Sequence, residues 1–121
     1  MRSVLLAVVC AAASSAWAAG DAERGRQAYE ARCGGCHSVD ADRIGPRHAG
    51  VVGRRAGSVP GFAYSDALRN SGLTWDAALL ERWLANPEAL VPGQRMGYQL
   101  ADAQARADIV AYLSTLAAGR K

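Results

Sequence analysis

The sequence predicts an all-α fold, with three main helices joined by long loops. Apolar residues recur at helical spacing in three segments, and no segment alternates apolar and polar residues as a strand would. The chain has 13 glycines and one phenylalanine among its 121 residues, and most of the glycines lie between the helical segments. A chain of this length fits one small domain, whose own apolar residues can make only a modest core.

The first helix is expected to begin after Asp21, a typical N-cap residue. The residues that recur at helical spacing after it are Ala22, Gly25, Ala28, Tyr29 and Cys33. Thr74 can cap a second helix, which Asn86-Pro87 would close. Its apolar face is formed by Leu79, Leu80, Trp83 and Leu84.

Asp102 can cap the third helix, and Gly119 would lie just beyond its end. The residues expected to face inward are Ile109, Val110, Tyr112, Leu113 and Leu116. Between the helices the chain is rich in Gly and Pro, as at 45–46, 60–61 and 92–93. Loops this long are unusual in a small domain unless they enclose something, and a large flat cofactor would explain them.

Residues 1–18 have the features of a cleaved signal peptide. Arg2 supplies a basic start, an apolar run too short to cross a bilayer follows, and Ala16 and Ala18 are small residues of the kind that signal peptidase accepts. We therefore expect residues 19–121 to form a single exported domain, periplasmic in a bacterium. A lipoprotein site at Cys10 is the alternative, although Val9 is larger than such a site prefers.

The charge and hydropathy of the remaining chain exclude other classes. Removing residues 1–18 takes away one of the 14 Lys and Arg residues and none of the 11 Asp and Glu residues. The small positive excess argues against nucleic-acid binding. No other apolar run approaches the roughly 18 to 20 residues of a membrane span. We expect a soluble protein without stable membrane insertion, and a monomer.

The segment Cys33-Gly34-Gly35-Cys36-His37 is typical of covalent haem attachment. Two cysteines three positions apart bring their sulfurs to one side of a helical turn, where they can add to two neighbouring vinyl groups of one porphyrin. His37 follows at once, so its imidazole can reach over the ring and bind the iron. The two glycines would leave room for the macrocycle. The segment predicts haem c.

Three other interpretations of the cysteine pair stay open. A thioredoxin-like dithiol would be expected in a βαβ pattern, which is missing around Cys33. A zinc site would need more ligands than the pair and His48 supply. A disulfide with an incidental histidine is compatible with an exported chain. The position of the motif at the end of the first helix favours haem c.

Met96 is the expected second axial ligand. It is the only methionine beyond residue 18, and it lies in a Pro-Gly loop rather than on an apolar helix face. A methionine that fills a gap in the core is one alternative. Ligation by His48 is another, but this residue follows Pro46-Arg47, where a surface histidine is the simpler explanation.

With these residues the chain resembles the class I cytochromes c, the bacterial and mitochondrial-like branch, from Gly20 to Leu116. The segment 20–25 with Tyr29 is similar to the first helix of that family, which crosses the last helix, here at Ile109 and Tyr112. The resemblance implies a cytochrome c fold wrapped around one haem c.

Further similarities carry family roles onto this chain. Gly45-Pro46 is similar to the turn whose proline carbonyl accepts a hydrogen bond from the ligand histidine. Gly53-Arg54 and residues 60–64 match as well. The resemblance implies that Arg54, Tyr64 and Trp75 surround the haem propionates. The chain departs from the family at Gln94, where many relatives have a threonine, at Trp83, where a tyrosine is common, and at Leu68, where an asparagine is frequent.

The resemblance implies single-electron transfer by a His37- and Met96-ligated iron, and not an enzyme. Electrons would pass at the exposed haem edge, near Arg95 and residues 43–47, during transient docking. The partners would be membrane respiratory or photosynthetic complexes, or soluble reductases. The alternatives are a haem subunit of a larger oxidoreductase, a gas-sensing module, and a peroxidase-like enzyme if Met96 is displaced.

Overall fold

The computed structural model describes residues 19–118. Within this range it contains five helices and no sheet, and its one isolated β-bridge joins Arg55 and Thr74. The helices are α1 (Ala22–Arg32), α2 (Asp66–Arg69), α3 (Ala77–Ala85), α4 (Pro87–Leu90) and α5 (Ala103–Leu113). Three of them exceed two turns, which confirms the predicted all-α class with three main helices. Residues 1–18 and Gly119, on which the signal peptide and the last helix end were predicted, lie outside the described residues.

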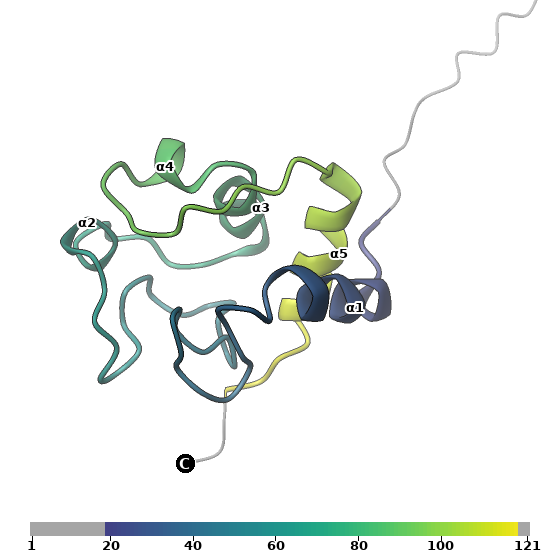
Figure 1. The fold of residues 1–121 in the computed structure, drawn as a ribbon, viewed down its shortest axis with the longest axis horizontal. Coiled ribbons are helices and arrows are strands. Elements are labelled where there is room, and N and C mark those ends of the chain that lie inside the picture. The colour runs from purple at the N-terminus through teal and green to yellow at the C-terminus, as the bar shows by residue number, and fades with distance from the viewer. Residues whose placement is uncertain (1–18, 119–121) are drawn as a thin grey trace, which may run out of the picture.

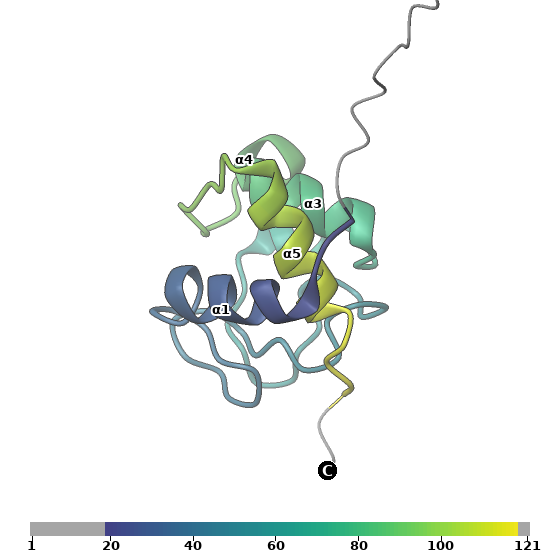
Figure 2. The same cartoon turned by 90° about the vertical axis from the view of Figure 1, so that its right-hand side faces the viewer.

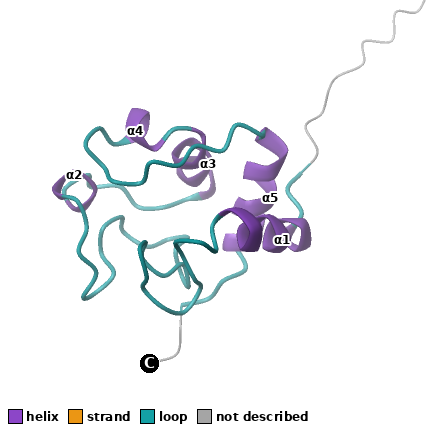
Figure 3. Ribbon diagram, in the orientation of Figure 1, coloured by secondary structure: helices purple, strands orange, loops and turns teal. Residues whose placement is uncertain are grey.

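Loops and turns make up most of the described chain (Figure 3). The helices α1 and α5 pack against each other and cross, and the long loop from α1 to α2 extends over the opposite part of the molecule (Figure 1). No helix among residues 19–118 is long and apolar enough to cross a membrane.

The first helix begins where the sequence predicts. Asp21 is the N-cap of α1, and its carboxylate accepts a 2.8 Å hydrogen bond from the Arg24 N–H. Only Gly25 and Tyr29 are buried, because this helix presents a narrow face to the rest of the chain. The predicted helix over residues 22–32 is confirmed.

The start of the second main helix was predicted wrongly. Asp76, not Thr74, is the N-cap of α3, and its carboxylate accepts a 2.7 Å hydrogen bond from the Leu79 N–H. Thr74 is instead held in an extended conformation by its bridge to Arg55. The helix ends at Asn86 as predicted, and Asn86 also caps the short α4, in which Pro87 takes the first position.

The last helix begins as predicted and ends early. The Asp102 carboxylate caps α5 by accepting bonds from the Gln104 and Ala105 N–H groups. Ser114 closes the helix, so Leu116, expected within it, follows it instead. Leu116 still packs against the core, and its carbonyl accepts a 3.0 Å hydrogen bond from the Gly50 N–H.

The helices α1 and α5 cross at Gly25, as the resemblance implied (Figure 2). A Cβ atom at Gly25 would lie 1.8 Å from the Asp108 carbonyl oxygen and 2.9 Å from the Tyr112 Cβ. The backbones can approach so closely only because this residue has no side chain. The core extends from this crossing to α3, and its largest buried apolar residues are Tyr29, Trp75, Leu80, Trp83, Leu84, Ile109 and Leu113.

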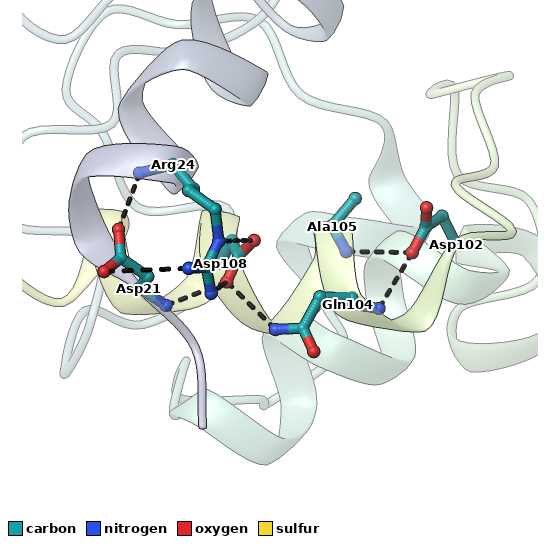
Figure 4. Close-up of polar contacts among 6 residues, drawn as sticks. All are labelled: Asp21, Arg24, Asp102, Gln104, Ala105 and Asp108. Atoms are coloured by element: carbon teal, nitrogen blue, oxygen red, sulfur yellow. Dashed lines mark hydrogen bonds and ion pairs between the residues drawn. The ribbon is translucent and has the colours of Figure 1, made fainter. Parts of the chain in front are cut away.

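Asp108 holds the two helices together at the crossing. Its carboxylate is 5% exposed and accepts bonds from the Asp21 N–H, the Arg24 guanidinium and the Gln104 amide, at 2.8 to 3.1 Å (Figure 4). The hydrogen bonds from Arg24 are the main cause that lowers the pKa of Asp108 to about 2, from an ordinary value of 3.8. The charged form is therefore the one that stabilises the crossing.

The substitution Asp108→Asn should lower the melting temperature by about 5 °C at neutral pH. Because the folded-state pKa lies below the unfolded value, the stabilisation is complete above about pH 4 and is lost as the pH falls toward about 2. Thermal unfolding followed across this range should show the wild type and the variant converging near pH 2. The exposed Asp40→Asn control should keep the wild-type pH profile; a constant gap between wild type and Asp108→Asn would contradict the assignment.

Candidate haem-binding site

The attachment segment continues α1 by one further turn. Cys33 is the C-cap of the helix, and its carbonyl accepts hydrogen bonds from the Cys36 N–H at 3.1 Å and the His37 N–H at 2.9 Å. Cys33 is partly buried and Cys36 is exposed, and no disulfide joins them. Burial raises the pKa of the Cys33 thiol to about 11. The turn presents both sulfurs and the imidazole from one short stretch of chain.

The two glycines of this segment differ in their roles. A Cβ at Gly34 would lie 2.6 Å from the Glu30 carbonyl oxygen, whereas a Cβ at Gly35 would meet no atom within 4 Å. The helix end itself therefore requires Gly34. Room for a macrocycle, the reason expected for both glycines, is therefore not needed to explain Gly34.

Arg43 holds the attachment segment from outside. Its guanidinium donates hydrogen bonds to the carbonyl oxygens of Gly34 at 2.6 Å, Gly35 at 3.3 Å and His37 at 3.2 Å. These carbonyls follow the end of a helix, where unpaired acceptors and the helix dipole favour a cation. Sequence reasoning placed Arg43 in a docking patch and missed this contact, since nothing local in the sequence distinguishes the two roles.

His37 is fixed by the turn at residues 45–46. Its Nδ1 donates a 2.9 Å hydrogen bond to the Pro46 carbonyl oxygen, so Nε2 is left without a proton. A Cβ at Gly45 would lie 2.1 Å from His37 Cε1, so this turn requires glycine. Burial lowers the pKa of His37, and the Pro46 hydrogen bond opposes this less strongly. The result is a neutral imidazole with one nitrogen free, which is the form that binds metals.

The expectation that His48 is a surface residue is wrong. Its ring is partly buried and stacks on the His37 ring, with centroids 4.2 Å apart and planes at 22°. Its Nδ1 shares a 2.9 Å hydrogen bond with the Tyr29 hydroxyl, and burial lowers its pKa to about 3. Two rings this close leave no space for a porphyrin between them. His48 therefore cannot be the ligand opposite His37.

Arg54 lies in a loop and is half-buried without an acidic partner among residues 19–118. Its guanidinium donates only to the carbonyl oxygens of Ala49 at 3.1 Å and Arg47 at 3.0 Å, and burial lowers its pKa. A desolvated cation of this kind is stabilised by an anion. The site therefore fits a group with carboxylates, such as the propionates of haem.

Tyr64 and Trp75 lie near Arg54. The Tyr64 hydroxyl accepts a 3.1 Å hydrogen bond from the Val59 N–H, and it acts electrostatically on Arg54. The main-chain N–H of Trp75 donates to the main-chain carbonyl of Arg54 at 2.9 Å, and the Trp75 ring packs edge-on against Trp83 with centroids 5.3 Å apart. The main chain of Trp75 therefore lies next to Arg54, as does the Tyr64 hydroxyl, and these are the three residues that the resemblance places around the propionates.

Met96 lies in the loop after α4, partly buried against the core. Its N–H donates to the side-chain oxygen of Gln94, whose amide in turn donates to Glu88 at 3.2 Å. The Glu88 carboxylate also accepts a 2.8 Å hydrogen bond from the Gly93 N–H. Gln94 therefore braces the methionine loop from within, a role that sequence reasoning did not assign to it or to Glu88.

The comparisons with known proteins agree with this arrangement. A family model described as cytochrome c matches residues 22–117. A protein named cytochrome c2 from Rhodomicrobium vannielii is 47% identical, over 95% of this chain and 97% of its own length. Cytochrome c from Euglena viridis is 44% identical, over 80% of this chain and 98% of its own length.

A solved structure gives the same result for the fold. Cytochrome cH from Methylobacterium extorquens superposes with a TM-score of 0.76 and 47% identity, over 79% of this chain and 99% of that chain. The chain therefore belongs to the cytochrome c family, and it is an electron carrier rather than an enzyme, with haem c bound covalently through Cys33 and Cys36.

Proposed function

We propose that this protein is an exported carrier of single electrons whose haem iron is ligated by His37 and Met96. The observation that carries the proposal is the hydrogen bond from His37 Nδ1 to the Pro46 carbonyl oxygen. It leaves Nε2 unprotonated and able to bind a metal, in the residue that directly follows the attachment cysteine Cys36. Met96 is the only methionine of the exported part, and its loop is braced by Gln94 and Glu88. Export is supported by the signal-like residues 1–18.

The mechanism follows from the ligands that His37 and Met96 would provide. When bound, a haem would supply an iron that can be ferric or ferrous. If His37 and Met96 both held that iron, no ligand position would stay open for a substrate. The neutral thioether of Met96 would favour the ferrous state and thus a higher reduction potential.

The loop residues at 54, 64 and 75 would hold the propionates. Arg54 provides the charge that the carboxylates need, and Tyr64 and Trp75 provide a hydroxyl and an indole N–H as hydrogen-bond donors. These groups would also exclude water from the propionates, which would strengthen the electrostatic influence of Arg54 on the iron.

The partners would be membrane complexes of a respiratory or photosynthetic chain, or soluble reductases, docked transiently at the haem edge. Two arginines of the expected docking patch at residues 43–47 already have partners within the chain. Arg43 binds main-chain carbonyls, and Arg47 pairs with Asp42 at 3.1 Å. Arg95 stays exposed, and Ile44 is 77% exposed beside the attachment segment. A small apolar contact with a few charges suits a short-lived electron-transfer complex.

Met96→Ala should abolish the weak long-wavelength absorption band of the ferric protein that arises from sulfur-to-iron charge transfer. The exposed Tyr98→Phe substitution in the same loop should leave the band intact, because it removes no sulfur. Absorption spectra of the ferric proteins test this directly. A wild-type spectrum without the band, or fast carbon monoxide binding by the reduced wild type, would contradict ligation by Met96.

Arg54→Gln should lower the reduction potential, because loss of a desolvated positive charge makes the ferric iron relatively more favourable. Arg55→Gln provides a matched control, since Arg55 is the exposed neighbour and water screens its charge. Redox titration of both variants should show a clear decrease for Arg54→Gln and almost none for Arg55→Gln. Equal shifts in the two variants would exclude a specific role of Arg54 at the propionates.

A further inference from the structure

One face of the His37 ring is covered by a second imidazole. The His48 ring lies almost parallel to it, with centroids 4.2 Å apart, while Gly45 lies against the ring edge at Cε1. The hydrogen bond to Pro46 fixes the direction of Nδ1 but lies in the plane of the ring. Rotation of the His37 ring about that hydrogen bond is restricted only by groups that pack on the faces of the ring. The His48 imidazole packs on one of these faces.

Tyr29 holds His48 in place. Its hydroxyl shares the 2.9 Å hydrogen bond with His48 Nδ1, and the two rings meet edge-on with centroids 5.5 Å apart. Tyr29 itself is 4% exposed on α1 and packs against Tyr112 of α5, with centroids 5.4 Å apart. The orientation of His48 is thereby tied to the crossing of the two helices, the most closely packed part of the described chain.

We propose that His48 is a positioning residue for the iron ligand and that Tyr29 acts through it. The stacked ring sets the plane of the His37 imidazole, and with it the orientation of the ligand relative to the porphyrin. This inference rests on the proposed ligation of the iron by His37. The plane of an axial imidazole determines which iron orbital holds the unpaired electron of the ferric state, so the effect is visible in spectra and in the reduction potential.

A space-filling role does not explain the pair. Burial of an imidazole costs free energy unless a partner is present, whereas an aliphatic side chain would fill the same space at no such cost. The Tyr29 hydroxyl is equally dependent on His48, since a phenylalanine would pack against Tyr112 just as well. The hydrogen bond between Tyr29 and His48 fixes the orientation of the imidazole, which neither a leucine at 48 nor a phenylalanine at 29 would do.

The test uses the haem-loaded protein and proton NMR of its ferric form, in which the four haem methyl resonances report the plane of the axial imidazole. His48→Leu should change the order or spread of these resonances and shift the reduction potential, while His48→Phe, which keeps a flat ring, should produce a smaller change. Tyr29→Phe should produce a change in the same direction as His48→Leu. Tyr112→Phe is the matched control, because it removes a hydroxyl from the same aromatic cluster without a contact to His48.

A double variant separates the proposal from a general loss of packing. In a His48→Leu background, Tyr29→Phe should cause no further change in the methyl pattern, because Tyr29 acts through His48. In the reduced wild type, nuclear Overhauser contacts should join the rings of His37 and His48, a measurement that needs no variant. Missing contacts, an unchanged pattern in His48→Leu, or equal effects of Tyr29→Phe and Tyr112→Phe would each overturn the proposal.

Failure of the proposed ligation would look different. If His37 does not bind the iron, the wild-type spectrum itself lacks the low-spin pattern of histidine ligation. If only the positioning role fails, the wild type keeps that pattern and the His48 variants share it unchanged.

Discussion

The hydrogen bond from His37 Nδ1 to the Pro46 carbonyl is the contact on which the haem site depends. It leaves Nε2 without a proton, and it joins the two ends of the loop of residues 38–45. Gly45 is required because the imidazole lies against the backbone there, and Arg43 ties the same loop back to the attachment segment. The segment of residues 43–46 thus fixes the orientation of His37, the path of the loop and the end of α1.

The cofactor explains why so much of the chain is loop. The protein's own core is concentrated where α5 packs against α1 and against α3, and it contains few large side chains for a domain of this size. The loops carry the remaining site residues: Arg54 and Tyr64 lie between α1 and α2, Trp75 lies between α2 and α3, and Met96 lies between α4 and α5. A covalently bound haem would give these loops a common surface, and the half-buried Arg54 guanidinium would gain the ion-pair partner that residues 19–118 do not provide.

The sequence predicted what local chemistry determines, and it failed where distant contacts decide. Asp21 and Asp102 cap their helices as expected, because capping involves residues two or three positions away. Thr74 and Asp76 are both good caps, and only the pairing of Thr74 with the distant Arg55 selects Asp76. The roles of Arg43 and His48 were missed for the same reason, since each contacts a group that folding brings near. Glu88 and Gln94 act within one loop, and their contacts depend on the turn of that loop, which the sequence alone does not define.

The central claim is that the haem completes the core of this domain, and removal of its attachment tests that claim most directly. The double variant Cys33→Ala, Cys36→Ala, prepared without haem, should have the far-ultraviolet circular dichroism of a largely unfolded chain, because α1 and the long loops lose the surface on which they are ordered. The haem-loaded wild type provides the helical reference. A native-like helical spectrum from the haem-free variant would show that the polypeptide folds on its own and would contradict this account.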